Sequence, residues 1–472
     1  MEACCVNKDA YDLAVIGAGS AGFSAAITAA EQGASVALIG RGTIGGTCVN
    51  IGCVPSKTMI RAAEAVHGAY RVGRFPGLAG EALVSDWRAL VAAKDDLVRT
   101  LRRKKYIDLL PEYEGVAYLQ GHAQLNGAGV LVDGRPIAAG KIIIATGASP
   151  AIPDIPGIES VPYLTSTTAL ELEEQPRSLL VIGGGYIGCE LAQMFARLGT
   201  RVTLVTRERL LPEAEPEIAQ ALDRYLADEG IAVRSGLTYS RIESREGEIT
   251  LTFDVDGRAE TLVAEKVLVT TGRSPNSAGL GLDEAGIKQM PTGGIYVDDR
   301  MRTSRPGIYA AGDVTGRDQF VYMAAYGAKL AARNALNGDS LVYDNTTMPW
   351  VVFTDPQVAG VGLSERQAIQ QGFDVKTSVV SLEQVSRALA ARDTRGLIKL
   401  IAEAGTGRLL GAQILAPEGA DSIQTMALAI KFGMTTAELG ETIFPYLTTV
   451  EGLKLAAQGF EKDVAKLSCC AG

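Results

Sequence analysis

The chain has 472 residues, which is long enough for about three domains, each with its own core. Apolar residues make up 47% and charged residues 21%, an ordinary globular composition that argues against a disordered or fibrous chain. The formal net charge of −9 argues against nucleic acid as the main partner, because such proteins normally present a basic face. The one basic run, RTLRRKKY from Arg99, is followed by acids and is interpreted as a solvated helix face.

The N-terminal segment, MEACCVNKDAYD, lacks the basic start and apolar run of a secretory signal, so we expect a cytoplasmic protein. The uncharged stretch from Leu13 to Ala30 could suggest a membrane span, but its glycines in a strand-turn-helix pattern explain it better. The seven cysteines are odd in number and clustered, which argues against a secreted disulfide framework. Cys4 and Cys5 have no motif around them and are expected to be accessory or inert.

The first motif is LAVIGAGSAGFSAAITAAEQGASVALIGR, which begins at Leu13. It predicts a buried strand, a G-x-G-x-x-G loop, an Ala-rich helix and a second strand. Glycine permits the tight turn at Gly17, the close approach of a pyrophosphate at Gly19 and helix-strand packing at Gly22. The helix N-terminus offers N–H groups and a positive dipole end to phosphate. The second strand ends in Gly40, where an acid is expected for a ribose hydroxyl, so that acid is missing.

The next motif, GGTCVNIGCVPSK, places Cys48 and Cys53 five positions apart. Pro55 suits the first position of a following helix. A structural disulfide closing so short a loop would constrain little, and a zinc site would lack two nearby ligands. Just before a helix N-terminus, the dipole favours the thiolate of Cys53. The pair is therefore interpreted as a redox centre.

A second dinucleotide unit, LLVIGGGYIGCELAQMFARLGTRVTLVTR, begins at Leu179. The same three glycine roles fall to Gly183, Gly185 and Gly188. Two such units in a complete strand-turn-helix-strand context strongly indicate dinucleotide binding. The second strand is followed by Arg207, and a cation there suits the 2′-phosphate of NADPH, although a plain surface arginine is the alternative.

Two segments flank this unit and echo each other: KIIIATGASP from Lys141 and KVLVTTGRSPN from Lys266. The segment GIYAAGDV from Gly307 predicts a strand that delivers Asp313 after a glycine turn. After about Asn337 the pattern changes to strands plus helices, which predicts an α+β domain. The expected fold class is α/β, with two Rossmann-like dinucleotide-binding domains and a C-terminal α+β domain.

In this order and combination, the motifs resemble the pyridine nucleotide–disulfide oxidoreductases over essentially the whole chain. The resemblance implies that the first unit binds FAD, that the second binds NADPH and that the C-terminal domain forms a homodimer interface. The implied division is residues 1–155 and 276–340 for FAD, 156–275 for NADPH and 341–472 for dimerisation and a cysteine tail. The implied FAD site comprises Gly17, Gly19, Gly22, Gly46, Thr47, Lys57, Thr146, Gly147 and Asp313; the implied NADPH site comprises Gly183, Gly185, Gly188, Arg207 and Gly272.

The same resemblance assigns catalytic roles. Cys53 is expected beside the flavin, with Cys48 as the outer, exchanging sulfur. Lys57 and Glu190 match an ion pair near the reactive nitrogen of the flavin, and Tyr186 matches the aromatic residue that covers the flavin where nicotinamide docks.

The substrate is suggested by the C-terminal region. Family members that reduce disulfides carry H-P-x-x-x-E, whose histidine is the acid-base catalyst. Here Glu451 is present, but Tyr446 stands at the histidine position, and a tyrosine is a poor proton shuttle near neutrality. The terminal CCAG adds Cys469 and Cys470, two adjacent soft thiols that suit a soft metal ion better than a disulfide.

The inner pair, the tyrosines and the terminal cysteines are similar to those of family members that reduce Hg(II) to elemental mercury with NADPH. Cys469 and Cys470 are then expected to receive Hg(II) and to pass it to Cys48 and Cys53. Two alternatives stay open: a dithiol–disulfide reductase, and a flavoprotein that only sequesters metal. An N-terminal G-M-T-C-x-x-C metal-binding domain, which many such relatives carry, is not expected here.

Overall fold

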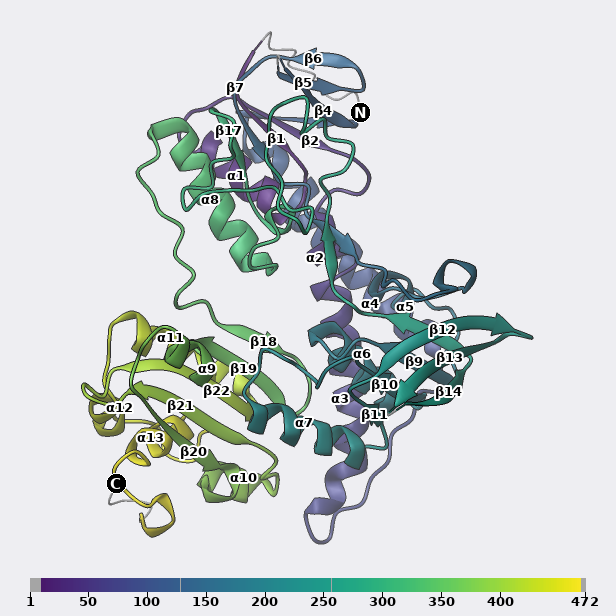
Figure 1. Ribbon diagram of the computed structural model, residues 1–472, viewed down its shortest axis with the longest axis vertical. Coiled ribbons are helices and arrows are strands. Elements are labelled where there is room, and N and C mark those ends of the chain that lie inside the picture. The colour runs from purple at the N-terminus through teal and green to yellow at the C-terminus, as the bar shows by residue number, and fades with distance from the viewer. Residues whose placement is uncertain (1–9, 128, 256, 468–472) are drawn as a thin grey trace. The chain divides into compact units, whose positions relative to one another are not determined.

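The computed structural model describes residues 10–127, 129–255 and 257–467, and it divides into two compact units (Figure 1). Of these residues, the first unit comprises 10–58, 88–151 and 272–344, and the second comprises 59–87, 152–271 and 345–467. In the part of the chain that the structure describes, no helix is long and apolar enough to cross a membrane.

The first unit is built on a five-stranded parallel sheet with the order β17-β7-β1-β2-β3. Its strands are β1 (Tyr11–Ile16), β2 (Val36–Gly40), β3 (Val116–Gln120), β7 (Ala139–Ile144) and β17 (Ile308–Ala310). Strands β1 and β2 are apolar and almost fully buried, as expected for a parallel sheet with covered faces. Helices α1 (Ser20–Ala30) and α8 (Val321–Asn337) pack side by side (Figure 1).

Two smaller sheets complete this unit. One is an antiparallel meander of β4 (Ala123–Asn126), β5 (Gly129–Val132) and β6 (Arg135–Ile137). The other pairs β8 (Ala148–Pro150) with β16 (Arg273–Pro275), so the ends of the two echoing segments meet as antiparallel strands.

The second unit contains a four-stranded parallel sheet with the order β11-β10-β9-β15. Its strands are β9 (Ser178–Ile182), β10 (Arg201–Val205), β11 (Ala232–Arg234) and β15 (Lys266–Val269), and helices α6 (Tyr186–Arg197) and α7 (Pro216–Asp228) belong to it. An antiparallel sheet of β12 (Thr238–Arg245), β13 (Glu248–Val255) and β14 (Arg258–Ala264) shares its apolar core, which includes Leu180, Ile242 and Phe253.

The same unit ends in a five-stranded antiparallel sheet with the order β18-β19-β22-β21-β20. Its strands are β18 (Trp350–Val352), β19 (Gln357–Gly362), β20 (Val375–Ser381), β21 (Leu397–Glu403) and β22 (Leu409–Ala416). Helices α11 (Gly419–Lys431), α12 (Thr436–Glu441) and α13 (Glu451–Gln458) contribute to one core with this sheet. The predicted fold class, two Rossmann-like regions and a C-terminal α+β region, is confirmed; the exact four-part division stays a prediction.

The cysteine motif occupies two helices. Cys48 lies in the short α2 (Gly46–Asn50), and α3 (Cys53–Tyr70) begins at Cys53 itself, two residues before the start predicted from Pro55. Cys53 is therefore in the first turn of the helix, where its sulfur still lies at the positive end of the dipole.

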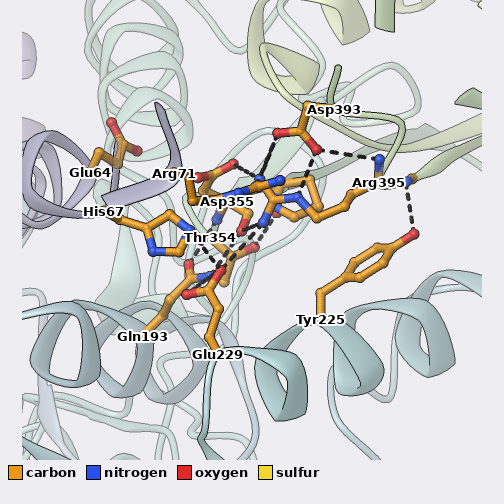
Figure 2. A network of polar contacts seen from close by, with 12 residues as sticks. Glu64, His67, Arg71, Gln193, Tyr225, Glu229, Thr354, Asp355, Asp393 and Arg395 are labelled. Carbon is orange, nitrogen blue, oxygen red and sulfur yellow. Dashed lines mark hydrogen bonds and ion pairs between the residues drawn. The ribbon is translucent and has the colours of Figure 1, made fainter. Parts of the chain in front are cut away.

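A network of ionised side chains fixes the second half of α3 within the second unit (Figure 2). Glu229 accepts two hydrogen bonds from Arg197, at 2.6 and 2.7 Å, and lies 3.6 Å from His67. Arg395 reaches Asp393, Asp355 and Glu229 at 2.8, 3.1 and 3.3 Å. Charges this deeply placed persist because each has a partner.

Candidate active site

The first glycine-rich loop is a cradle made of backbone. A Cβ on Gly17 would lie 2.2 Å from the Ala145 carbonyl oxygen, and one on Gly22 would lie 1.7 Å from the Gly17 oxygen. A Cβ on Gly46 would lie 2.6 Å from the Cα of Gly19, so two backbone segments approach here without side chains between them. Helix α1 has Gly19 as its N-cap and no side-chain cap, which leaves its first N–H groups for a phosphate.

The thiols of Cys48 and Cys53 are hydrogen-bonded to each other and form no disulfide. Cys48 is half-buried and Cys53 is exposed. The hydrogen bond to Cys53, followed by burial, raises the pKa of Cys48 well above its ordinary value. The Lys57 ammonium acts in the opposite direction and favours the Cys48 thiolate. The motif therefore presents two coupled thiols, and the pair loses its first proton more easily than its second.

Tyr106 lies beside this dithiol, and sequence reasoning missed it. Its ring packs edge-on against Phe23 at 4.8 Å, and its hydroxyl lies 3.4 Å from the Ser20 hydroxyl. Burial raises the pKa of Tyr106, and the charges of Cys48 and Cys53 add to that rise. The tyrosine ends the basic run that was interpreted as a solvated face; the three basic residues before it are exposed, but Tyr106 points inward.

Asp313 begins a 3-10 turn directly after β17. Gly312 before it has a φ of +76°, and a Cβ there would lie 3.1 Å from that of Ala21 on α1. Burial raises the pKa of Asp313, and Arg273, whose Nε lies 3.6 Å away, partly offsets this rise. The strands β7 and β17 thus deliver this carboxylate next to the glycine-rich loop.

The turn at Thr146 and Gly147 is fixed by one residue of the echoing segment. Asn276 receives a 2.7 Å hydrogen bond from the Thr146 hydroxyl, and its own side-chain amide donates to the Thr146 carbonyl at 3.0 Å. The backbone N–H of Asn276 donates to the Gly147 carbonyl at 2.9 Å. Gly272, with φ +110°, opens the strand that carries this clamp.

The second glycine-rich loop repeats the first. A Cβ on Gly183 would lie 2.5 Å from the carbonyl oxygen of Thr270, and a Cβ on Gly188 would lie 1.8 Å from the carbonyl oxygen of Gly183. Gly185 is the uncapped N-cap of α6. Arg207 is exposed, and its guanidinium lies 5.4 Å from the ring centre of Tyr239. This position leaves its donors accessible to a phosphate.

Tyr186, the first residue of α6, stacks on Trp350 of β18 with ring centres 5.6 Å apart and an angle of 24°. One turn later, Glu190 is buried, and its carboxylate accepts a 2.9 Å hydrogen bond from the Phe353 N–H. Trp350 was not among the predicted site residues. The pairing of Glu190 with Lys57 stays a prediction.

Other predicted cysteine and tyrosine sites differ in their surroundings. Tyr446 is 53% exposed in the segment between α12 and α13, and the neighbouring Leu447 N–H donates to Glu451 at 3.1 Å. Cys469 and Cys470 lie outside the described residues. Cys189 is buried, and its thiol donates to the Gly184 carbonyl, so this cysteine has a packing role. Within residues 10–127, 129–255 and 257–467, no group of three or more His, Cys, Asp or Glu side chains could hold a metal ion.

Comparison with known proteins identifies the family. Residues 11–332 match the model of the pyridine nucleotide-disulphide oxidoreductases, and residues 348–457 match the dimerisation domain of the same family. The chain belongs to the pyridine nucleotide-disulphide oxidoreductases. Within this family it is 48% identical to a mercuric reductase of Staphylococcus aureus over 99% of this chain and 85% of that protein. It is also 48% identical to a mercuric reductase of Streptomyces lividans over 98% of both chains.

A solved structure of this kind is the Cu(II) complex of the HOCl-induced flavoprotein disulfide reductase RclA from Escherichia coli. It superposes with a TM-score of 0.84 at 31% identity, covering 95% of this chain and 99% of that one. The membership that the motifs implied is therefore confirmed.

Proposed function

We propose that this chain is an NADPH-dependent flavoprotein that reduces thiol-bound Hg(II) to elemental mercury. Relatives named mercuric reductase match it over nearly its whole length. The observation that carries the proposal is the hydrogen-bonded pair of thiols, Cys48 and Cys53, which has a dinucleotide-binding loop beside it. The chain offers this pair no histidine to exchange protons. Reduction of a metal ion needs the thiols but no such base.

The residues of the first unit fit FAD. The backbone cradle around Gly17, Gly19 and Gly46 has room for a diphosphate only because it lacks side chains. Asp313 lies next to it as a half-buried acceptor for a hydroxyl of the cofactor chain. When bound, FAD supplies a two-electron relay between the hydride of NADPH and the thiol site. The exposed Arg207 would bind the 2′-phosphate of NADPH.

The dithiol then acts as a metal-binding site. Cys48 and Cys53 take Hg(II) from two carrier thiols by ligand exchange, because soft thiolates exchange readily on a soft ion. Cys469 and Cys470 would bring the ion to them, with Tyr186 and Tyr446 beside the path. The balanced reaction is Hg(SR)₂ + NADPH → Hg(0) + NADP⁺ + 2 RS⁻ + H⁺. Elemental mercury holds no thiolate ligand and leaves.

The positions of both histidines support this proposal over disulfide reduction. His67 lies fourteen residues after Cys53 on α3, about 20 Å along the helix axis, and contacts Glu229. His122 follows β3, where its backbone N–H donates to Asp133. Neither carries the acid-base role that thiol–disulfide exchange needs.

A homodimer is part of the proposal. The matched dimerisation domain exposes a set of large apolar side chains: Leu428, Phe432, Ile443, Tyr446 and Leu447. Apolar side chains gathered on one domain are typical of a protein interface. We also propose that the enzyme works in the cytoplasm, where NADPH and reduced thiols are available.

The test measures NADPH oxidation by the FAD-loaded protein with Hg(II) in excess low-molecular-weight thiol, against lipoamide and glutathione disulfide at equal concentration. Sustained turnover with Hg(II) and negligible turnover with both disulfides is expected. Comparable rates with a disulfide would refute the proposal. Stoichiometric Hg(II) binding without sustained NADPH oxidation would mean a sequestering protein instead.

The cysteine tail has its own comparison. Replacing Cys469 and Cys470 together by alanine should slow turnover most when Hg(II) is held by bulky thiols that cannot reach Cys48 directly. With small ligands the loss should be smaller. Equal rates of wild type and variant with every mercury complex would exclude a role for the tail.

A further inference from the structure

The end of β2 lacks the acid that usually binds a ribose, and the structure shows why. Gly40 is the last residue of β2 and is buried. A Cβ there would lie 2.7 Å from the Cβ of Ala18 and 2.8 Å from the hydroxyl oxygen of Tyr118. Both distances are shorter than van der Waals contact, so neither aspartate nor glutamate fits at position 40 while Tyr118 keeps its place.

The oxygen of Tyr118 occupies the region where such an acid would begin. Tyr118 lies on β3, two residues before Gln120, which pairs with Gly40 across the parallel ladder. Its ring also lies close, with Cε2 3.0 Å from the same Cβ position. Ala18, whose Cβ lies 2.7 Å from the same position, belongs to the glycine-rich loop between β1 and α1. The hydroxyl therefore lies close to the end of β2 and to the loop that would receive the diphosphate.

A phenol can make the same kind of contact as the missing carboxylate. It donates one hydrogen bond and accepts another, so either hydroxyl of a ribose can pair with it. Burial raises the pKa of Tyr118, so the phenol stays neutral at any physiological pH. Neutral recognition costs less desolvation than a carboxylate and gives a weaker hydrogen bond.

We propose that the Tyr118 hydroxyl binds the adenosine ribose of FAD in place of the absent acid, and that glycine at position 40 provides the room for it. This inference rests on the proposed function only in taking FAD as the ligand of the first unit. It adds Tyr118 to the cofactor site. It also explains Gly40, because the Tyr118 side chain leaves no room for a side chain at position 40.

The experiment measures the dissociation constant of FAD by the fluorescence of the free flavin, using apoprotein prepared from wild type and Tyr118→Phe. Removing one hydroxyl should weaken FAD binding about three- to ten-fold. An FAD analogue whose adenosine ribose lacks its 2′- and 3′-hydroxyls should bind wild type more weakly than FAD does. It should bind Tyr118→Phe with little further loss, because the two changes remove the same contact.

Tyr113→Phe is the matched control, since Tyr113 precedes the opposite end of β3. It should leave FAD affinity unchanged, and the thermal midpoints of all three apoproteins should agree. If Tyr118→Phe and wild type bind FAD with equal affinity, this inference is overturned and the proposed function is not. If the Tyr118→Phe change weakens binding of the analogue as much as binding of FAD, the inference is also overturned, because the effect then does not involve the ribose hydroxyls. A wild-type protein that binds no FAD would overturn the proposed function as well.

Discussion

The ring of Tyr186 stacks on the indole of Trp350, with ring centres 5.6 Å apart. The indole fits there because residue 360 is a glycine: a Cβ on Gly360 would lie only 2.4 Å from the Cζ2 atom of Trp350. The family position of Tyr186 implies that this side chain covers the nicotinamide site. Trp350 then supports the Tyr186 ring by stacking on it.

Trp350→Leu should therefore loosen Tyr186 and raise the KM for NADPH several-fold. Gly360→Ala should act in the same direction by displacing the indole. The measurement is the KM for NADPH and the rate of flavin reduction in a stopped-flow experiment, with the thermal midpoint as a check on folding. Unchanged NADPH kinetics in a folded Trp350→Leu protein would remove Trp350 from the site.

The dithiol should titrate as a coupled pair. Because the hydrogen bond to Cys53 is the largest cause of the raised pKa of Cys48, Cys53→Ala should return that pKa toward its ordinary value. The ultraviolet absorbance of thiolate, followed against pH, measures this in reduced protein. The Cys48 thiolate should appear at a lower pH in the variant than in wild type, where Cys48 is the second thiol of the pair to ionise. A Cys48 thiolate that appears at the same pH in both proteins would contradict the coupling. Cys189→Ala, which removes a buried thiol elsewhere, should leave the curve unchanged.

His67 should make the protein less stable as pH falls. Burial lowers its pKa from 6.5 to about 4, so the folded protein keeps it neutral while the unfolded chain protonates it. Stability is therefore lost between pH 6.5 and 4, by roughly 2–3 kcal/mol in the free energy of unfolding. His67→Gln should lack this loss, so the difference in thermal midpoint between the two proteins should change across that window. A constant difference from pH 7.5 to 4.5 would contradict the expected titration.

Lys399 is 1% exposed and is held by three carboxylates: Glu365 at 2.7 Å, Glu215 at 2.8 Å and Glu217 at 3.0 Å. Lys399→Met leaves Glu215 buried without its cation, which should lower the free energy of unfolding by about 3–5 kcal/mol. Adding Glu215→Gln should recover part of this loss. Lys466→Met is the matched control, because its pair with Asp463 is exposed and should contribute under about 1 kcal/mol. Similar losses for the two lysines would contradict the buried network.

The parts of the fold that could be predicted from the sequence are those with local causes. Gly17 and Gly183 were predicted because no other residue combines a positive φ with so close a backbone contact. The helix after Cys53 was predicted from Pro55, but its start was placed two residues late because helix ends depend on contacts of the first turn.

The residues that were missed reach their places through contacts distant in the sequence. Tyr106 follows Cys48 by more than fifty residues and stands in a basic run, so its inward side chain has no local signal. Trp350 of β18 and Tyr186 of α6 are distant in the sequence, so their contact has no local signal either. The missing acid at Gly40 could be seen in the sequence, but the reason for it, Tyr118 on the neighbouring strand, depends on the register of β2 with β3.

In the proposed reaction, the electrons of NADPH reach Hg(II) at the dithiol site. The most direct measurement is the amount of volatile mercury trapped per NADPH oxidised, without oxygen, by wild type, Cys48→Ala and Cys53→Ala. We expect one mercury atom per NADPH for wild type and a rate at least about a hundred-fold lower for each variant. NADPH oxidation without release of mercury, or unimpaired mercury release by both variants, would contradict it.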